Sequence, residues 1–498
     1  LWKIKDGSNY TDYMYKSHGH KYAIKNPAGG IYTEDYGKGN VYAVMCPHAR
    51  GWQEVLEKLV RRISSYGFNG VYHDQVGTGG PRMCYDRSHG HLLNDSSVWL
   101  EKGYWPLFDN FFAYLHKNHP GFCHTTEENA EPYLKQMDGY LVWRWTDNGQ
   151  IPLYQSIYSG RAQFVGRLYN HNHPGDRQSF FSKLGQQLVN AEQLGWFMPS
   201  EVREADNRRL FTKKAMHVRF ALLDWFNCGR MLAPIDFGST MKFEQPRWGG
   251  NAPQHVRMPV IANSAWLGQD GSRMWLFVNT QQKESVAVPS IRSAKGFWIC
   301  REGASAPVFS KSALPVKLKP LGFEVWIEGS KAKAEAVQKT LRKIASFDAG
   351  KPIRLVTKFA AKKITGTPDK FYTAADASGN LYCNAAANNS HFGWIQDGAL
   401  ISFGTVDFGK AGARTAVVKV AVDPGYAGGT IQLLTTKAGR PETVSAVFPL
   451  KSTGGWTQYR EIRMPLKSVL TGPHQVLFKI NGNAACNFAG WKYQSKDH

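Results

Sequence analysis

Short apolar runs alternate with helical patterns through residues 41–143, and parallel β/α units are the arrangement that accommodates this alternation. The helical stretches space their apolar residues as the buried stripe of a helix does, whereas the runs between them have strand character. A sheet of parallel strands covered by helices buries both patterns together. The strand-like runs lie at 41–45, 70–72, 121–124 and 139–143, and the helical stretches lie at 52–63 and 107–115.

The predicted fold class is multidomain, α/β followed by all-β. Residues 1–228 are expected to form a TIM-type (β/α)8 barrel portion, and because the roughly 40 residues before the first run lack the pattern of two β/α units, an N-terminally incomplete barrel is one alternative. Residues 229–330 predict a small antiparallel β domain. A charged helix predicts a helical linker at 331–352, and closely spaced turns predict a β-sandwich (jelly roll) at 353–498.

Two carboxylates stand where strand-like runs give way to polar sequence. Asp74 follows the run at 70–72, and Glu127 follows the run at 121–124. The carboxyl ends of neighbouring parallel strands lie about 4.8 Å apart at the backbone, which is compatible with the roughly 5 to 5.5 Å between the two carboxyls of a retaining glycosidase. The pair therefore predicts glycoside hydrolysis, although either residue alone is more often a helix cap or a salt-bridge partner.

The identity of the second carboxylate stays open between three glutamates. Glu128 and Glu131 compete with Glu127, because a slip of one residue in a strand exchanges the faces of the sheet. Glu131 could also bond substrate or orient the acid.

Aromatic and polar residues that flank these strand ends are candidates for substrate binding. Aromatic rings stack on sugar faces, and polar groups bond hydroxyls. The candidates are Tyr72, His73, His89, His91, Glu131, Trp143, Arg144 and Trp145.

Histidines and cysteines raise the alternative of a metal enzyme. His-x-His pairs occur at 18–20, 89–91 and 171–173, but none directly follows a convincing strand, so we predict no metal and no cofactor. The seven cysteines form no CxxC pair. Cys383 and Cys486 are the best candidates for a disulfide, because both fall in the predicted sandwich.

Residues 71–77, 84–91, 126–131 and 138–139 resemble a family of largely uncharacterised, mostly bacterial glycoside-hydrolase-like barrel proteins. The resemblance covers about residues 40–230. By analogy with retaining α-glycosidases, such as the α-amylase superfamily and endo-α-N-acetylgalactosaminidases, it implies Asp74 as nucleophile and Glu127 as acid/base.

The C-terminal region resembles a family 6 carbohydrate-binding module. The resemblance is carried by residues 392–398, 401–409 and 453–456, and by an Asn ahead of Trp491. Members of that family hold a terminal sugar between two aromatic rings and bond its hydroxyls with an Asn, which implies that Trp394, Trp456 and Asn487 bind glycan.

The positive charge bears on the choice of partner. The net charge is +22, and residues 331–498 hold 23 Lys and Arg against 10 Asp and Glu. Such a surface favours a polysaccharide of acidic or sulfated type, and without a recognition motif we predict no nucleic acid partner. Apolar runs are too short for a membrane span. We expect a secreted or periplasmic glycosidase; the alternative is a non-catalytic glycan-binding protein with an incomplete barrel.

Overall fold

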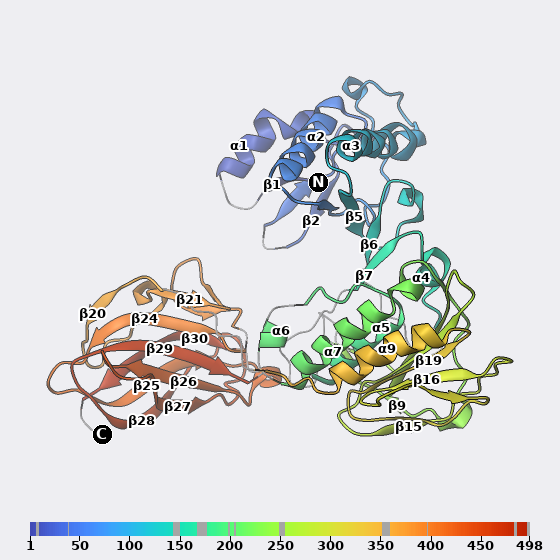
Figure 1. Cartoon of the computed structure of the whole chain (residues 1–498). Coiled ribbons are helices and arrows are strands. Elements are labelled where there is room, and N and C mark those ends of the chain that lie inside the picture. Colours follow the sequence, from blue (N-terminus) through green and yellow to red (C-terminus); the bar gives the residue numbers. More distant parts are fainter. Residues whose placement is uncertain are drawn as a thin grey trace.

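A computed structural model describes most of this chain. Figure 1 shows an N-terminal α/β part, a central part in which helices cover an antiparallel sheet, and a C-terminal part of two stacked sheets. The described residues are 1–5, 9–37, 39–142, 150–166, 177–197, 200–203, 206–248, 254–350, 359–395, 397–482 and 486–495.

Four strands form a parallel sheet in the N-terminal part. They are β4 (Gly70–His73), β5 (Cys123–Glu127), β6 (Gly139–Val142) and β7 (Gln163–Gly166), and they are hydrogen-bonded in that order. The predicted β/α alternation is therefore present. Among the described residues this sheet has four strands, so the predicted eight-stranded barrel is not seen as a closed structure.

Helices α2 (Arg50–Ser65) and α3 (Trp105–Asn118) precede β4 and β5. The side chains of α3 that face the sheet recur at helical spacing, which explains why its pattern could be recognised. A short helix, α4 (Leu153–Tyr158), precedes β7. The buried residues of α3 are Leu107, Phe108, Phe111 and Leu115.

The strand predicted at 41–45 lies outside the parallel sheet. It forms β3 (Val41–Ala43), which is antiparallel to β1 (Trp2–Lys5) on one side and to β2 (Thr33–Asp35) on the other. The prediction of a first parallel β/α unit is thus wrong in one respect, because its strand belongs to a separate antiparallel sheet. Helix α1 (Asn9–Ser17) connects β1 to the turn that precedes β2.

The central part has one core that helices share with an antiparallel sheet. Helices α5, α7 and α9 lie side by side on one face of the sheet (Figure 1), and residues from 180 to 344 bury their apolar side chains together. The helices are α5 (Arg177–Val189), α6 (Ser200–Arg203), α7 (Asn207–Ala221), α8 (Leu223–Phe226) and α9 (Lys331–Ile344). Among the described residues, no helix has both the length and the apolar character needed to cross a bilayer.

Six strands make the sheet on which these helices pack. In spatial order they are β17 (Val308–Ser310), β16 (Phe297–Arg301), β19 (Phe323–Glu328), β14 (Arg273–Asn279), β13 (Ile261–Leu267) and β8 (Arg230–Met231). Three two-stranded ribbons accompany the sheet. They are β9 (Phe243–Glu244) with β12 (Met258–Pro259), β10 (Arg247–Trp248) with β11 (Gln254–His255), and β15 (Ser285–Ala287) with β18 (Val316–Leu318).

The C-terminal part is the β-sandwich that its turn pattern predicts. Its two sheets enclose a core that includes Phe403, Phe478 and Trp491. One sheet contains β20 (Lys363–Thr365), β21 (Gly379–Leu381), β24 (Leu400–Asp407), β26 (Thr430–Thr436), β27 (Thr443–Pro449) and β29 (Pro473–Asn481). The other contains β22 (Asn384–Ala385), β23 (Phe392–Gly393), β25 (Ala413–Ala421), β28 (Arg460–Leu470) and β30 (Asn487–Gln494).

The predicted disulfide of the sandwich is not formed. Cys383 and Cys486 are both free and buried, so each thiol packs as a small apolar group within the core.

Candidate active site

Asp74 and Glu127 lie at the C-terminal ends of the neighbouring strands β4 and β5. Tyr72 of β4 pairs in register with Thr125 of β5, and each carboxylate lies two residues further along its own chain. Because side chains two apart in a strand share a face, Glu127 at the end of β5 projects on the same side as Thr125, and Asp74 directly follows the end of β4.

A cavity of about 310 Å³ lies beside β4, which is an edge strand of the parallel sheet. Asp74, Tyr72 and Glu34 line it together with apolar side chains of α2 and α3. The exposed carboxylate of Asp74 therefore faces a space bordered by both aromatic and acidic groups.

Glu127 is held by the loop that carries Asp74. Its side chain is 7% exposed, and Thr78 Oγ1 donates a hydrogen bond to Glu127 Oε2 at 3.2 Å. Gly77 N–H donates to Thr126 Oγ1 at 3.0 Å, and a Cβ on Gly77 would lie 2.2 Å from the Glu127 carbonyl oxygen. The loop after β4 thus packs on the end of β5 and fixes one carboxylate relative to the other.

The two competing glutamates occupy other positions. Glu128 has a φ of +60°, and its N–H donates to the Leu141 carbonyl at 3.0 Å, so the chain turns away from the strand there. Glu131 begins a 3₁₀ helix and accepts a 2.5 Å hydrogen bond from the Tyr158 hydroxyl. Glu127 is the last residue of β5, the strand next to β4, and it is not among the residues that line the cavity.

His73, the last residue of β4, packs toward α3 and lines the cavity together with Asp74. Its Nε2 is 2.9 Å from Nδ1 of His124, and its ring packs against the rings of Phe108 and Phe111. Burial lowers the pKa of His73 to about 3, with a smaller effect from His124, and burial lowers the pKa of His124 to about 4. Both rings are therefore neutral at pH 7 and belong to the packing between sheet and helix.

These two histidines predict acid sensitivity. A folded-state pKa below the unfolded value means that the unfolded chain binds more protons, so stability is complete above about pH 6.5 and falls as the pH drops toward 4. We expect the free energy of unfolding in urea to fall by about 2 to 4 kcal/mol between pH 6.5 and pH 5. His73→Phe should remove about half of that loss, and an unchanged pH dependence in this variant would contradict the assignment.

Three residues near the cavity were not found from the sequence. The Tyr36 hydroxyl donates to Glu34 Oε2 at 2.7 Å, and the pKa of Tyr36 is raised by burial, by this bond and by the charges of Glu34, Asp74 and Glu127. Trp196 packs edge-on against Tyr72, with ring centroids 5.9 Å apart. Glu34 and Tyr36 lie in a short acidic segment without periodicity, and Trp196 lies far along the chain.

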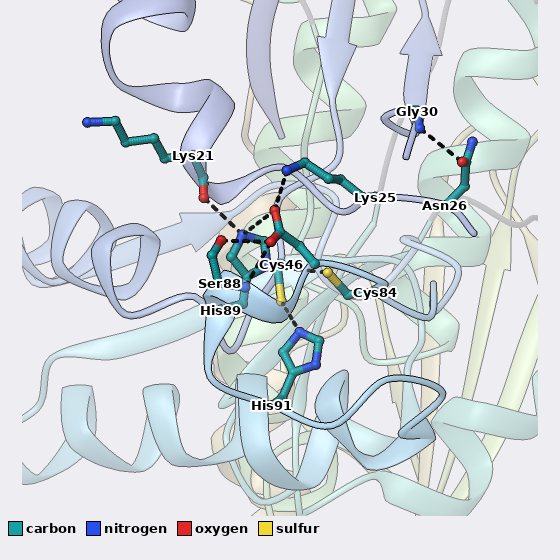
Figure 2. Close-up of polar contacts among 10 residues, drawn as sticks. Lys21, Lys25, Asn26, Gly30, Cys46, Cys84, Ser88, His89 and His91 are labelled. Carbon is teal, nitrogen blue, oxygen red and sulfur yellow. Dashed lines mark hydrogen bonds and ion pairs between the residues drawn. The ribbon is translucent and has the colours of Figure 1, made fainter. Parts of the chain in front are cut away.

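The other predicted substrate-binding residues lie elsewhere. His89 and His91 converge with two cysteines, and neither lines the cavity (Figure 2). Trp143, Arg144 and Trp145 lie outside the described residues.

The structure brings the three residues predicted to bind glycan in the C-terminal sandwich to one place. Trp394 is 72% exposed and has a φ of +52°, a backbone conformation that costs energy for a bulky residue. Asn487 Nδ2 donates to the Trp456 carbonyl at 2.8 Å, and a Cβ on Gly393 would lie 3.2 Å from Asn487 Oδ1. Trp456 also packs against Tyr426, with ring centroids 5.2 Å apart.

Two family models match this chain. Residues 2–170 match a domain of unknown function, DUF6259. Residues 373–494 match the carbohydrate binding module of family 6. This part of the chain is a family 6 carbohydrate-binding module. The module contains Trp394, Trp456 and Asn487, and its family indicates carbohydrate binding.

Curated relatives support a connection to glycoside hydrolases. A "Putative glycoside hydrolase" of Bacteroides thetaiotaomicron is 29% identical over 287 residues, covering 56% of this chain and 41% of the relative. A "Putative glycoside hydrolase 22789" of Monosiga brevicollis is 27% identical over 184 residues, covering 34% of this chain and 15% of the relative. The chain thus spans less than half the length of these relatives.

A solved structure also aligns with this chain. CsCBM6-3 from Clostridium stercorarium, in complex with cellobiose, is 18% identical and covers 28% of this chain and 98% of its own, with a TM-score of 0.22.

Proposed function

We propose that this chain is a retaining glycoside hydrolase that cleaves α-linked O-glycosidic bonds of a polysaccharide and holds its substrate through the family 6 module. The proposal is supported by the pairing of β4 with β5, because Asp74 follows the first strand and Glu127 ends the second. The relatives named as glycoside hydrolases support it.

In the proposed reaction Asp74 attacks the anomeric carbon while Glu127 protonates the departing glycosidic oxygen. The bond between the anomeric carbon and that oxygen breaks, and a glycosyl ester forms on Asp74. Glu127 then takes a proton from water, and the resulting nucleophile attacks the anomeric carbon and releases Asp74. The two inversions retain the configuration of the sugar.

Glu127 is buried and accepts a hydrogen bond from Thr78, whereas Asp74 is exposed, so the two carboxylates lie in different surroundings, as the two roles require. A screen of native polysaccharides with analysis of the released products tests the activity and identifies the sugar and the linkage.

The proposed substrate is an anionic polysaccharide, sulfated or rich in uronate. The net charge of +22 supports this choice. We expect affinity for such a glycan to fall severalfold when the salt concentration rises from 0.05 to about 0.5 M, because the Debye length shortens. Titration calorimetry at both salt concentrations measures the change in affinity. Equal affinity at the two concentrations would show that glycan binding does not depend on the positive charge.

Glycan binding by the module is expected to depend on Trp394. Removing a ring that stacks on a sugar should weaken binding by about 10- to 100-fold in Trp394→Ala, while the exposed position leaves the melting temperature unchanged. Phe309→Ala is the matched control, since Phe309 is a 44% exposed aromatic outside the module. Normal affinity in Trp394→Ala would place the binding surface elsewhere.

A second candidate function is glycan binding without catalysis. The four-stranded parallel sheet of the described residues favours it, because a TIM-barrel active site is built from the ends of eight strands. This candidate predicts normal affinity for polysaccharide and no released reducing sugar with any glycan of the panel.

We place the protein outside the cytoplasm, secreted or periplasmic, because polysaccharides are encountered there. The module and the relatives named as glycoside hydrolases support this placement.

A further inference from the structure

Two cysteines and two histidines converge in the N-terminal part, apart from the carboxylates. The ligand atoms of Cys46, Cys84, His89 and His91 all lie within 4.8 Å of one another. The two cysteines and His89 are buried, and His91 is partly buried. Figure 2 shows the four side chains pointing toward one region.

The local backbone explains this convergence. Cys46 lies between β3 and α2, and Cys84 lies in the long segment that joins β4 to α3. His89 and His91 flank Gly90, whose φ of +79° is the left-handed conformation that glycine adopts without strain. The turn at Gly90 brings both imidazole rings close to the two cysteine sulfurs. The His-Gly-His sequence thus explains how both histidines reach the same cluster.

Each histidine has one ring nitrogen directed at a sulfur and the other at a backbone carbonyl. His89 Nδ1 is 3.3 Å from Cys84 Sγ, and its Nε2 is 2.9 Å from the Lys21 carbonyl oxygen. His91 Nε2 is 3.6 Å from Cys46 Sγ, and its Nδ1 is 2.9 Å from the Leu92 carbonyl oxygen. A proton on the nitrogen that faces the carbonyl leaves a lone pair facing the sulfur, which is the tautomer that a metal ligand requires.

A nearby ion pair completes the surroundings. Lys25 Nζ pairs with Asp86 at 2.6 Å, so the nearest carboxylate is already neutralised. Two thiolates would therefore be balanced by one divalent cation.

Two of the ligand-to-ligand distances match the dimensions of a tetrahedral zinc site. Zinc–sulfur bonds of about 2.3 Å and zinc–nitrogen bonds of about 2.0 to 2.1 Å at a tetrahedral angle place sulfur and nitrogen about 3.5 Å apart. The two sulfur–nitrogen contacts measure 3.3 and 3.6 Å.

We propose that Cys46, Cys84, His89 and His91 bind one zinc ion. The set of two thiolates and two neutral imidazoles is typical of tetrahedral zinc, and four protein ligands leave no position for a catalytic water. None of the four lines the cavity beside Asp74, which also indicates a structural site. The ion would tie the segment between β4 and α3, which begins with Asp74, to the chain between β3 and α2.

Zinc content is the first test of the site. The full chain is expressed with zinc in the medium and desalted, its metal content is measured by mass spectrometry, and its thiols are counted after denaturation. We expect about one zinc per chain, with Cys46 and Cys84 both reduced. Removal of the ion with a strong chelator should lower the melting temperature by about 5 to 10 °C, and added zinc should restore it.

Variants and cobalt substitution identify the ligands. His91→Asn, at the least buried position, should still fold and should lose most of the zinc, whereas Cys46→Ser should lose it completely. His48→Asn and Cys123→Ser are matched controls that should keep one zinc; the His48 ring lies 5.6 Å from that of His91, and Cys123 is exposed. Cobalt in place of zinc should give the visible bands and the thiolate charge-transfer band of tetrahedral coordination.

Three results would overturn the site. They are zinc at background in the folded wild-type chain after equilibration with the ion, a disulfide between Cys46 and Cys84 in the native chain, and full zinc content in His91→Asn and Cys46→Ser together. Because the readout is metal content, the test does not depend on hydrolysis.

Discussion

Asp74→Ala is expected to abolish hydrolysis of the natural polysaccharide. Without the nucleophile no glycosyl ester can form, and the rate should fall by about 10⁴-fold or more, as for other enzymes that lose a covalent nucleophile. Asp74 is exposed, so the substitution should change the melting temperature little. Release of reducing sugar, measured beside the melting curve, separates lost chemistry from lost folding.

Asp109→Asn is the matched control for this loss. Asp109 is a partly exposed carboxylate on α3 that pairs with Lys135 at 2.9 Å and does not line the cavity beside Asp74. It should retain wild-type activity. Binding of glycan through the module should be normal in both variants. Full activity in Asp74→Ala would contradict the assignment of Asp74 as the nucleophile.

Glu127→Gln should reduce hydrolysis by about 10²- to 10⁴-fold through loss of the proton donor. The glutamine oxygen can still accept the hydrogen bond from Thr78, so the loop after β4 should stay in place. The loss should be smaller for substrates whose leaving group needs no protonation, such as aryl glycosides with an acidic phenol. The rates with natural and activated substrates measure this difference.

Glu128→Gln and Glu131→Gln are the controls for this second carboxylate, because they remove the competing glutamates one at a time. Each should retain most of the activity. If Glu131→Gln were the inactive variant and Glu127→Gln the active one, the acid/base role would pass to the residue that accepts the Tyr158 hydrogen bond.

Sequence periodicity predicted much of the fold because each element buries one face. The stripes of α2 and α3 and the runs of β4, β5 and β6 could be recognised in this way. The antiparallel pairing of β3 could not be predicted, because a three-residue strand has the same pattern whether its neighbours run parallel or antiparallel. The apolar faces of α5, α7 and α9 were visible too, but an apolar face does not specify which sheet it covers.

The candidate site was predictable only where a residue ends a recognisable strand. Asp74 and Glu127 meet that condition, because they stand at the ends of β4 and β5, which are paired neighbours. Glu34 lies in a segment without periodicity, so nothing indicated its place in the cavity wall. His89 and His91 were noticed as a pair, yet their partners Cys46 and Cys84 are distant in sequence and lack a CxxC spacing.

The configuration of the product formed by Asp74→Ala in azide tests the central claim most directly. Azide can replace the missing carboxylate and attack the anomeric carbon from the same side, while Glu127 still protonates the leaving oxygen. From an α-linked substrate the account predicts recovered cleavage and a β-glycosyl azide, identified by nuclear magnetic resonance. An α-glycosyl azide, or no rescue while Asp74→Ala hydrolyses at the wild-type rate, would contradict it.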